Sequence, residues 1–238
     1  MNLQEFKTGV QDSVPIAAGY IGVSFSFGIA AAKFGISPID ACIMSLTNMT
    51  SAGQFAAITL IYSGTTYFEL ILTQFIINLR YALMSLSLSQ KLAPHTGTLS
   101  RLLIAYANTD EIFAVAVSRD RPVTGSYMAG LEIPPIIGWS VGALLGAIAD
   151  SILPLSVRSA LGISLYAMFV AIVLPPVKKH HAIGVVSLFA IALSCSIAYI
   201  PVFKGLSSGF SIIFCTIVGS TFGAVFFPIP DPNEEDSL

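Results

Sequence analysis

Five positions that could do chemistry interrupt the apolar stretch LTNMTSAGQFAA. They are Asn48, Thr50, Ser51, Gly53 and Gln54. A helix that breaks near Gly53 would start a second half-helix there, and the positive end of that half-helix would favour a carboxylate or another anion. Broken helices of this kind form substrate sites in many transporters. In the alternative interpretation, the small residues permit close helix packing while Asn48 and Gln54 bond neighbouring helices.

A permanent positive charge, Arg80, lies at the centre of the apolar stretch LTQFIINLRYALMSLSL. Insertion scales put the cost of a central arginine at about 2.5–3.5 kcal/mol, so its guanidinium should face protein, water or a carboxylate instead of lipid. Two polar stripes run along the predicted helix, one with Thr73, Arg80 and Ser87 and the other with Gln74, Asn78, Tyr81 and Ser85. We therefore expect a central helix in which Arg80 either neutralises a substrate or gating carboxylate or forms a fixed structural ion pair.

Two carboxylates, Asp110 and Glu111, follow Asn108 and Thr109 in the stretch AYANTDEIFAVA. Threonine is a good N-cap and a helix dipole favours carboxylates in the first turn, so capping alone explains the pair. The alternatives are proton exchange that couples or gates transport, and an ion pair with Arg80, because burial favours the protonated carboxyl unless a cation opposes it.

The composition is that of a membrane protein. Of 238 residues, 55% are hydrophobic and only 10% are charged, and the mean hydropathy is +0.82. The apolar runs are continuous and do not alternate as barrel strands would, so the predicted class is all-α with about seven transmembrane helices. A single transmembrane domain over 1–238 would contain a polar amphiphilic segment at 98–121 and helices near 14–32, 39–62 (broken), 67–90, 126–150, 157–177, 182–202 and 206–227.

The distribution of basic residues predicts an orientation. If the segment 98–121 stays on one side, one face of the membrane collects Lys33, Lys91, Arg101, Arg119, Arg121, Lys178 and Lys179. The other face keeps Lys7, Arg158 and Lys204. Basic residues accumulate in the cytoplasm, so this arrangement places the N-terminus outside and the C-terminus inside. If the segment crosses instead, the charges divide five against five and the bias disappears.

Similar proline and glycine spacings suggest an internal repeat. The positions are Pro15, Gly19 and Gly22 in the first predicted helix and Pro134, Gly138 and Gly142 in the fourth. Two sets of three helices would then be related by inverted topology, an arrangement in which many transporters place a substrate site at the membrane midplane.

The sequence offers no sign of a metal site, a cofactor or an enzyme. Cys42, Cys195 and Cys215 lie in apolar spans without paired spacing, and the three histidines lie outside the spans. The motifs H-E-x-x-H and G-x-S-x-G are absent from the sequence. PPVKKHHA has the basic flank typical of a cytoplasmic helix end, and a formal net charge of −2 gives no indication of nucleic acid binding.

Several segments resemble the large permease subunit of the AzlC-type branched-chain amino acid exporters. They are the Pro/Gly helix from Pro15 to Gly28, then MSLTNMTSAGQFAA, NLRYALMSLSLS, NTDEIFAVA and YAMFVAIVLPP, in matching order over most of 10–180. One difference is that many members carry AG-x-x-Q-F, whereas Ala52, Gly53, Gln54 and Phe55 are contiguous here.

The resemblance implies a multi-pass permease of the bacterial cytoplasmic membrane that exports branched-chain or related aliphatic amino acids. It also implies a small membrane partner of the AzlD type and use of the proton gradient. For this chain we expect substrate contacts from Asn48, Ser51, Gly53, Gln54, Asn78 and Arg80. Asp110 and Glu111 would serve proton coupling or gating. The alternative functions are a passive channel and a membrane scaffold that transports nothing.

Overall fold

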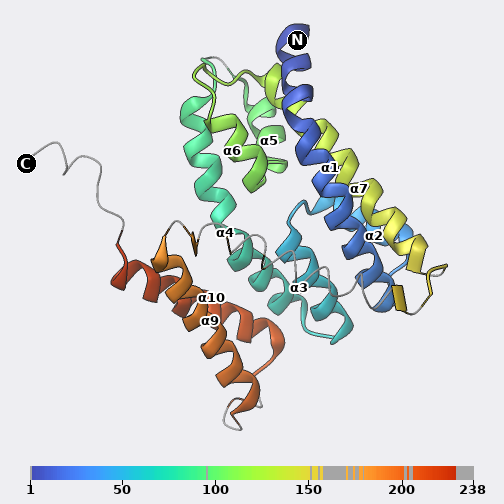
Figure 1. Ribbon diagram of the computed structural model, residues 1–238, viewed down its shortest axis with the longest axis vertical. Coiled ribbons are helices and arrows are strands. Elements are labelled where there is room, and N and C mark those ends of the chain that lie inside the picture. The colour runs from blue at the N-terminus through green and yellow to red at the C-terminus, as the bar shows by residue number, and fades with distance from the viewer. Residues whose placement is uncertain are drawn as a thin grey trace, which may run out of the picture. The chain divides into compact units, whose positions relative to one another are not determined.

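The computed structural model describes residues 2–94, 96–150, 180–200 and 206–228, with a few isolated positions between 152 and 203. The helices are α1 (Leu3–Lys33), α2 (Pro38–Thr47), α3 (Ser51–Tyr62), α4 (Tyr67–Lys91), α5 (Thr98–Tyr106), α6 (Asp110–Val117), α7 (Gly125–Asp150), α9 (His181–Tyr199) and α10 (Ser208–Phe226) (Figure 1). The all-α class is confirmed, because extended pairing among the described residues amounts to one isolated bridge, Leu92 with Val123. Most of the helix expected over 157–177 lies outside the described residues.

Within the described residues, five helices are long and apolar enough to cross a membrane, namely α1, α4, α7, α9 and α10. The count of seven crossings stays a prediction. The chain divides into two compact units, a first unit of 1–63 with 78–166 and a second unit of 64–77 with 167–238. That all 238 residues form one transmembrane domain also stays a prediction.

The first unit is built on a parallel pair of helices, α1 and α7. Gly9 of α1 lies against Tyr127 and Leu131, and Gly28, near the other end of α1, lies against Ala143 and Ala147. The backbones touch, since a Cβ added to Gly28 would lie 2.1 Å from the Ala143 carbonyl oxygen. Small residues permit this approach between membrane helices. The expected three-helix inverted repeats are not confirmed. Inverted repeats would begin with helices of opposite direction, whereas α1 and α7 run in the same direction.

The segment 39–62 does not form one broken helix that crosses the membrane. It forms two half-helices, α2 and α3, that fold back on each other as a hairpin. Ala41 of α2 and Ile58 of α3 pack into one buried cluster, and nearer the tip the Gln54 amide bonds the Ser45 hydroxyl at 2.8 Å. At the open end, the Tyr62 ring lies 4.9 Å from that of Phe34, directly after α1. The hairpin therefore opens at the C-terminal end of α1.

The segment 98–121 forms a second hairpin, from α5 and α6, that opens at the other end of α1. Ile104 and Ile112 share one buried cluster on either side of its tip. At its open end, the Lys91 ammonium donates to the carbonyls of Val117 and Arg119. The Arg119 guanidinium in turn lies 3.0 Å from the Glu5 carboxylate in the first turn of α1.

Each half-helix is too short to cross a bilayer alone. The four contain 10, 12, 9 and 8 residues. At about 1.5 Å per residue they extend about 12–18 Å, roughly half of a hydrocarbon core of about 30 Å. The hairpins enter from opposite ends of α1, and their tips pack together, because Met49 and Ala107 belong to one cluster with Tyr20 and Trp139.

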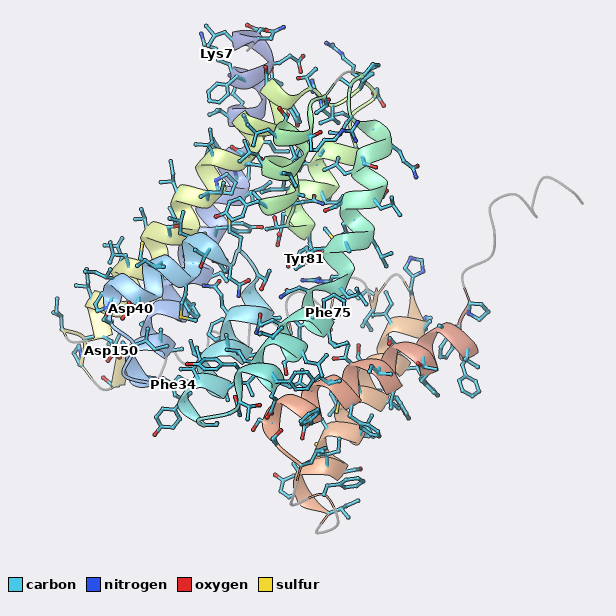
Figure 2. All side chains as sticks on the ribbon, turned by 180° about the vertical axis from the view of Figure 1, so that it is seen from behind. Lys7, Phe34, Asp40, Phe75, Tyr81 and Asp150 are labelled. Atoms are coloured by element: carbon cyan, nitrogen blue, oxygen red, sulfur yellow. The ribbon has the colours of Figure 1, made fainter. Side chains whose placement is uncertain are left out.

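This arrangement corrects the grouping of basic residues. Figure 2 shows Lys7 at one end of the first unit and Phe34, Asp40 and Asp150 at the other. Lys33, in the last turn of α1, lies at the end away from Lys7 and away from the Lys91–Arg119 contact. The seven-helix arrangement grouped it with Lys91. Among described residues of the first unit, the end that contains the start of α1 collects Lys7, Lys91, Arg101, Arg119 and Arg121.

The second unit joins the start of α4 to the antiparallel pair α9 and α10. Phe189 and Phe222 stack at 4.2 Å between ring centroids. Glu69, which is buried, accepts hydrogen bonds from the Ser207 hydroxyl and from the Gly209 N–H at 3.0 Å. A carboxylate at this position satisfies the start of α10 and complements its dipole.

Candidate functional site

The two hairpin tips, 48–50 and 107–109, meet beside Tyr20 of α1 and Trp139 of α7. We call this region the hairpin junction. The Tyr20 and Trp139 rings pack edge to face at 5.0 Å, and both side chains are buried. The tips also contact each other directly, because the Tyr106 hydroxyl donates to the Leu46 carbonyl. Non-helical backbone is therefore enclosed by protein at the level where the half-helices end.

The first hairpin breaks at 48–50, three residues before the expected position at Gly53. Asn48 follows α2, and its side-chain oxygen accepts a hydrogen bond from the Thr50 hydroxyl at 2.9 Å. α3 begins at Ser51, so Gly53 lies buried within its first turn. That turn contains no acidic residue, so no carboxylate of its own complements the positive end of the α3 dipole.

Gln54 holds three helices together at the junction. Its side chain is fully buried, its Oε1 accepts from Trp139 Nε1 at 2.7 Å, and its Nε2 donates to Ser45 Oγ at 2.8 Å. Both ends of the amide thus have partners on α7 and α2. For this residue the contacts correspond to the second sequence interpretation, in which it bonds neighbouring helices.

The second tip is tied to α1 through Tyr20. The Tyr20 hydroxyl donates to Glu111 Oε2 at 2.6 Å and lies 2.6 Å from Thr109 Oγ1. Thr109 occupies the N-cap position of α6 but its side chain makes no capping hydrogen bond, and Asp110 and Glu111 form the start of that helix. The carboxylates occupy the first turn, as the capping interpretation expects, and Glu111 also bonds outside its own helix.

Arg80 forms an ion pair with Asp110. The guanidinium lies 2.6 Å from the carboxylate, and the two side chains are 52% and 47% exposed. Arg80 also donates to the Tyr81 hydroxyl at 3.0 Å, and its guanidinium lies 4.8 Å from the centre of the Tyr81 ring. The charge therefore meets a carboxylate, as one sequence interpretation expects. About half of each side chain is therefore not covered by the described part of the protein.

The expected central position of α4, with protein or water around much of the helix, is not confirmed. Only 6% of its apolar window is buried. Its exposed side chains include Phe68, Ile71, Phe75, Leu79, Leu83 and Leu86. Asn78 is half-buried two residues before Arg80. The polar stripes, which predicted protein or water around the helix, make contacts such as the Arg80–Asp110 pair and the Ser85–Asn108 hydrogen bond.

Asn108 was not among the expected site residues, and its chemistry fits a binding role. It is buried at the second tip, and its Nδ2 donates to Ser85 Oγ at 3.1 Å. Among the described residues, its buried Oδ1 has no hydrogen-bond donor. An unsatisfied buried acceptor is costly, so this oxygen is suited to accept a hydrogen bond from a bound molecule.

Sequence reasoning also missed Tyr20 and Trp139, which connect the Gln54 contacts to the Glu111 contacts. A signal existed for Trp139, because it is the single tryptophan of the chain and a buried indole N–H usually finds an acceptor. No comparable signal marks Tyr20, whose partners lie about ninety positions away in the chain.

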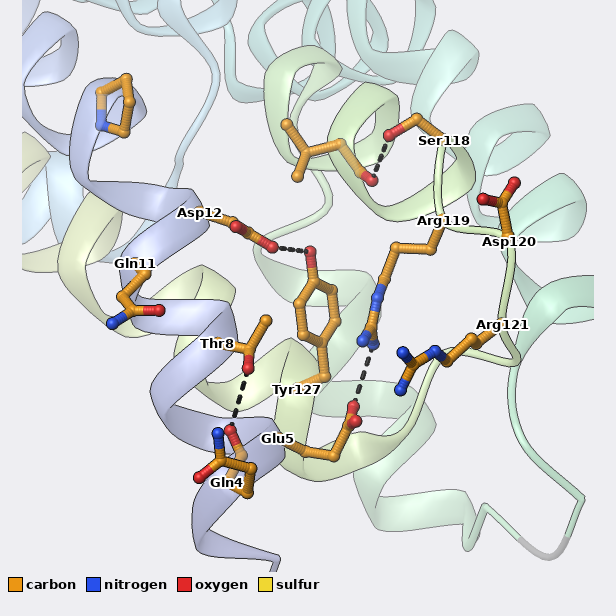
Figure 3. Close-up of a pocket in the computed structure, with 12 residues that line it drawn as sticks. Gln4, Glu5, Thr8, Gln11, Asp12, Ser118, Arg119, Asp120, Arg121 and Tyr127 are labelled. Atoms are coloured by element: carbon orange, nitrogen blue, oxygen red, sulfur yellow. Dashed lines mark hydrogen bonds and ion pairs between the residues drawn. The ribbon is translucent and has the colours of Figure 1, made fainter.

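A pocket of about 850 Å³ lies at the end of the first unit where α1 begins (Figure 3). It is lined by Gln4, Glu5, Thr8, Gln11, Asp12, Pro15, Val115, Ser118, Arg119, Asp120, Arg121 and Tyr127. Among the residues that the structure describes, no group of three or more His, Cys, Asp or Glu side chains could hold a metal ion.

Replacing Gln54 tests whether the junction depends on its two hydrogen bonds. In Gln54→Leu, buried Trp139 and Ser45 lose a partner, which should lower the free energy of unfolding by about 1–3 kcal/mol. Thermal unfolding in detergent should show a lower Tm than for Thr59→Val, a control on the exposed face of α3. In Gln54→Leu combined with Trp139→Phe, the losses should be smaller than additive. Full additivity would contradict the contact.

Comparison with known proteins identifies the family of this chain. Residues 15–153 match the family described as AzlC protein. An "Uncharacterized membrane protein" of Archaeoglobus fulgidus is 37% identical over 194 residues, which is 79% of this chain and 84% of that protein. "Inner membrane protein YgaZ" of Escherichia coli is 28% identical over 197 residues, 79% of this chain and 80% of that protein.

"Branched-chain amino acid transport protein AzlC" of Bacillus subtilis is 22% identical over 184 residues, which is 74% of this chain and 71% of that protein. No solved structure matches the chain. The family match covers both hairpins, α7 and the part of α1 from Pro15 onward, so it includes the whole hairpin junction. The chain is therefore a membrane protein that belongs to the AzlC family.

Proposed function

We propose that this protein is a secondary transporter that exports branched-chain or related aliphatic amino acids across the cytoplasmic membrane, driven by the proton gradient. The observation that carries the proposal is the meeting of two half-helix hairpins from opposite ends of α1 beside an accessible ion pair. Non-helical backbone at membrane depth is tolerated where protein encloses it or where it lines a water-filled cavity. Transporters use such breaks for substrates, and the Bacillus subtilis relative is named as a transport protein.

The hairpin junction offers complementary groups for a zwitterionic amino acid. The start of α3, with Asn48, Ser51 and Gly53, would attract the carboxylate, because no acidic residue in the first turn opposes it. The buried Oδ1 of Asn108 would receive the ammonium group. Asn78 and Arg80 remain proposed contacts on α4. We assign Gln54 to positioning, because both ends of its amide already bond protein.

The Arg80–Asp110 pair gives a physical route to proton coupling. While Asp110 is charged, it holds the guanidinium at 2.6 Å. Protonation removes that attraction and leaves the guanidinium to pair with the substrate carboxylate. Glu111 would act with it, because protonation of Glu111 weakens its bond to Tyr20 and so loosens the contact between α1 and α6. Protonation of Asp110 would thus change the charge at the junction, and protonation of Glu111 would weaken the contact that keeps the junction closed.

A small membrane subunit of the AzlD type belongs to the proposal as the partner that the family resemblance implies. A passive channel and a scaffold are the competing functions. A channel would carry amino acids only down their own gradient, whereas a proton-coupled transporter concentrates them. A scaffold would move none.

Transport measured in proteoliposomes tests the function. The purified protein, with and without the small subunit, should accumulate labelled leucine, isoleucine or valine against its gradient when a pH gradient is imposed. A hydrogen bond to a charged group contributes about 1.5–3 kcal/mol, and every 1.4 kcal/mol is about tenfold. Asp110→Asn and Arg80→Gln should therefore each slow coupled transport by about tenfold or more.

Arg101→Gln serves as the control, because Arg101 is exposed in the first turn of α5, away from the tip. It should transport like the unaltered protein. Accumulation that ignores both the pH gradient and Asp110→Asn would contradict proton coupling at this pair. Movement of amino acids only down their gradient would favour the channel, and no movement with the subunit present would favour the scaffold.

The corrected charge distribution also orients the protein. Five basic residues lie at the end where α1 begins and Lys33 alone at the other, among described residues of the first unit. Basic residues accumulate in the cytoplasm, so we propose that α1 begins on the cytoplasmic side. This reverses the orientation expected when 39–62 was taken to cross the membrane.

Cysteine labelling in cells tests this orientation. In a background with Cys42, Cys195 and Cys215 replaced by serine, Asp120→Cys should react with an impermeant maleimide only after the membrane is permeabilised. Ser63→Cys, at the other end of the first unit, should react in intact cells. Both residues are exposed in the structure. The opposite labelling pattern would overturn the orientation.

A further inference from the structure

The pocket at the start of α1 is not part of the hairpin junction, yet it lies on the same elements. We propose that it is the cytoplasmic vestibule through which an amino acid enters, and that Tyr20 closes its inner end. The inference rests on the transport function proposed above. It adds a second binding region and a gate to that function.

The walls of the pocket carry opposite charges (Figure 3). Glu5 and Asp12 project from α1, while Arg119 and Arg121 come from the loop after α6. The Arg119 guanidinium lies 3.0 Å from Glu5 and stacks 3.7 Å from the centre of the Tyr127 ring. A zwitterion in this space can direct its ammonium group to the carboxylates and its carboxylate to the guanidinium groups.

Tyr127 stands between the two kinds of charge. Its hydroxyl donates to Asp12 at 2.8 Å, and the Arg119 guanidinium stacks on its ring. These contacts fix the charged side chains on either wall instead of leaving them to extend into water. An amino acid in the pocket therefore meets charged side chains that are already held in position, with the polar side chains of Thr8 and Gln11 beside them.

Two helices that line the pocket, α1 and α6, continue from it to the junction. Thr8, Asp12, Ile16 and Tyr20 recur every four residues and so share one face of α1. Tyr20 lies two turns beyond Asp12, about 12 Å along the helix. On α6, Glu111 lies one turn before Val115, a lining residue. Two of the helices that line the pocket, α1 and α6, are thus joined just beyond it by the Tyr20–Glu111 hydrogen bond.

Tyr20 has the contacts expected of a gate. It is buried, it bonds both Glu111 and Thr109 of the second hairpin, and it packs on Trp139 beside the first tip. Ile16, one turn before Tyr20, packs against two buried clusters, one of which contains Tyr20. While the hydrogen bonds persist, α1 and α6 stay together and separate the vestibule from the start of α3. Breaking them opens the path.

Thiol accessibility measures both parts of the proposal. In the cysteine-free background, Gln11→Cys should react with an impermeant methanethiosulfonate added from the side where α1 begins, and saturating leucine should slow the reaction. Val14→Cys is the matched control, because Val14 is exposed on α1 but does not line the pocket. It should stay unreactive because that face contacts lipid.

Ser51→Cys reports on the junction. From the same side it should react slowly, and about tenfold faster when Tyr20→Phe removes both hydrogen bonds. Glu111→Gln, which weakens one of them, should give a smaller increase and replaces Tyr20→Phe if that variant does not fold. An unreactive Gln11→Cys, or one that leucine does not protect, would overturn the vestibule. Unchanged reactivity of Ser51→Cys in both variants would overturn the gate.

Transport by the unaltered protein separates this inference from the function on which it rests. If amino acids are transported but the thiols behave otherwise, the vestibule and gate are wrong and the transporter stands. If the thiol pattern is found without transport, the transporter is wrong.

Discussion

The fold depends on one constraint: where a helix is interrupted in the middle of a membrane, the non-helical backbone must find its hydrogen-bond partners within the protein. Two breaks, at 48–50 and 107–109, occur where the half-helices end, and their tips pack on each other. Gln54 joins the first hairpin to α7, and Tyr20 joins the second hairpin to α1. The Tyr20 and Trp139 rings connect these two sets of hydrogen bonds. One continuous set of contacts with α1 and α7 therefore stabilises both breaks.

The α1–α7 pair makes this arrangement possible. Its backbones touch at Gly28 and Gly146, so the two long helices form one support from which hairpins can enter at either end. Because the hairpins open in opposite directions, paths from the two sides of the membrane would converge at the tips. Arg80 and Asp110 lie there with half of each side chain accessible. The proposed transport site and the proposed vestibule follow from this geometry, with Tyr20 between them.

Much of the fold class was predictable, but the course of the chain was not. Continuous apolar runs predicted helices, and the polar cluster around Asn48 predicted a break. The reversal of 39–62 was missed, because an apolar run with a break has the same composition whether the chain continues or turns back. That error placed Lys33 with Lys91 and reversed the orientation. Arg80 could be expected to meet a carboxylate, whereas the contacts of Tyr20 and Trp139 depend on distant segments.

Cross-linking within the first hairpin tests the central claim most directly. The Phe34 and Tyr62 rings lie 4.9 Å apart, whereas a single crossing helix over 39–62 would separate Tyr62 from the end of α1 by the hydrocarbon core, about 30 Å. In a cysteine-free background, Phe34→Cys with Tyr62→Cys should be joined by a short bifunctional thiol reagent in native membranes. A labelled but uncrossed pair would show that the chain continues across the membrane, and the junction described here would not exist.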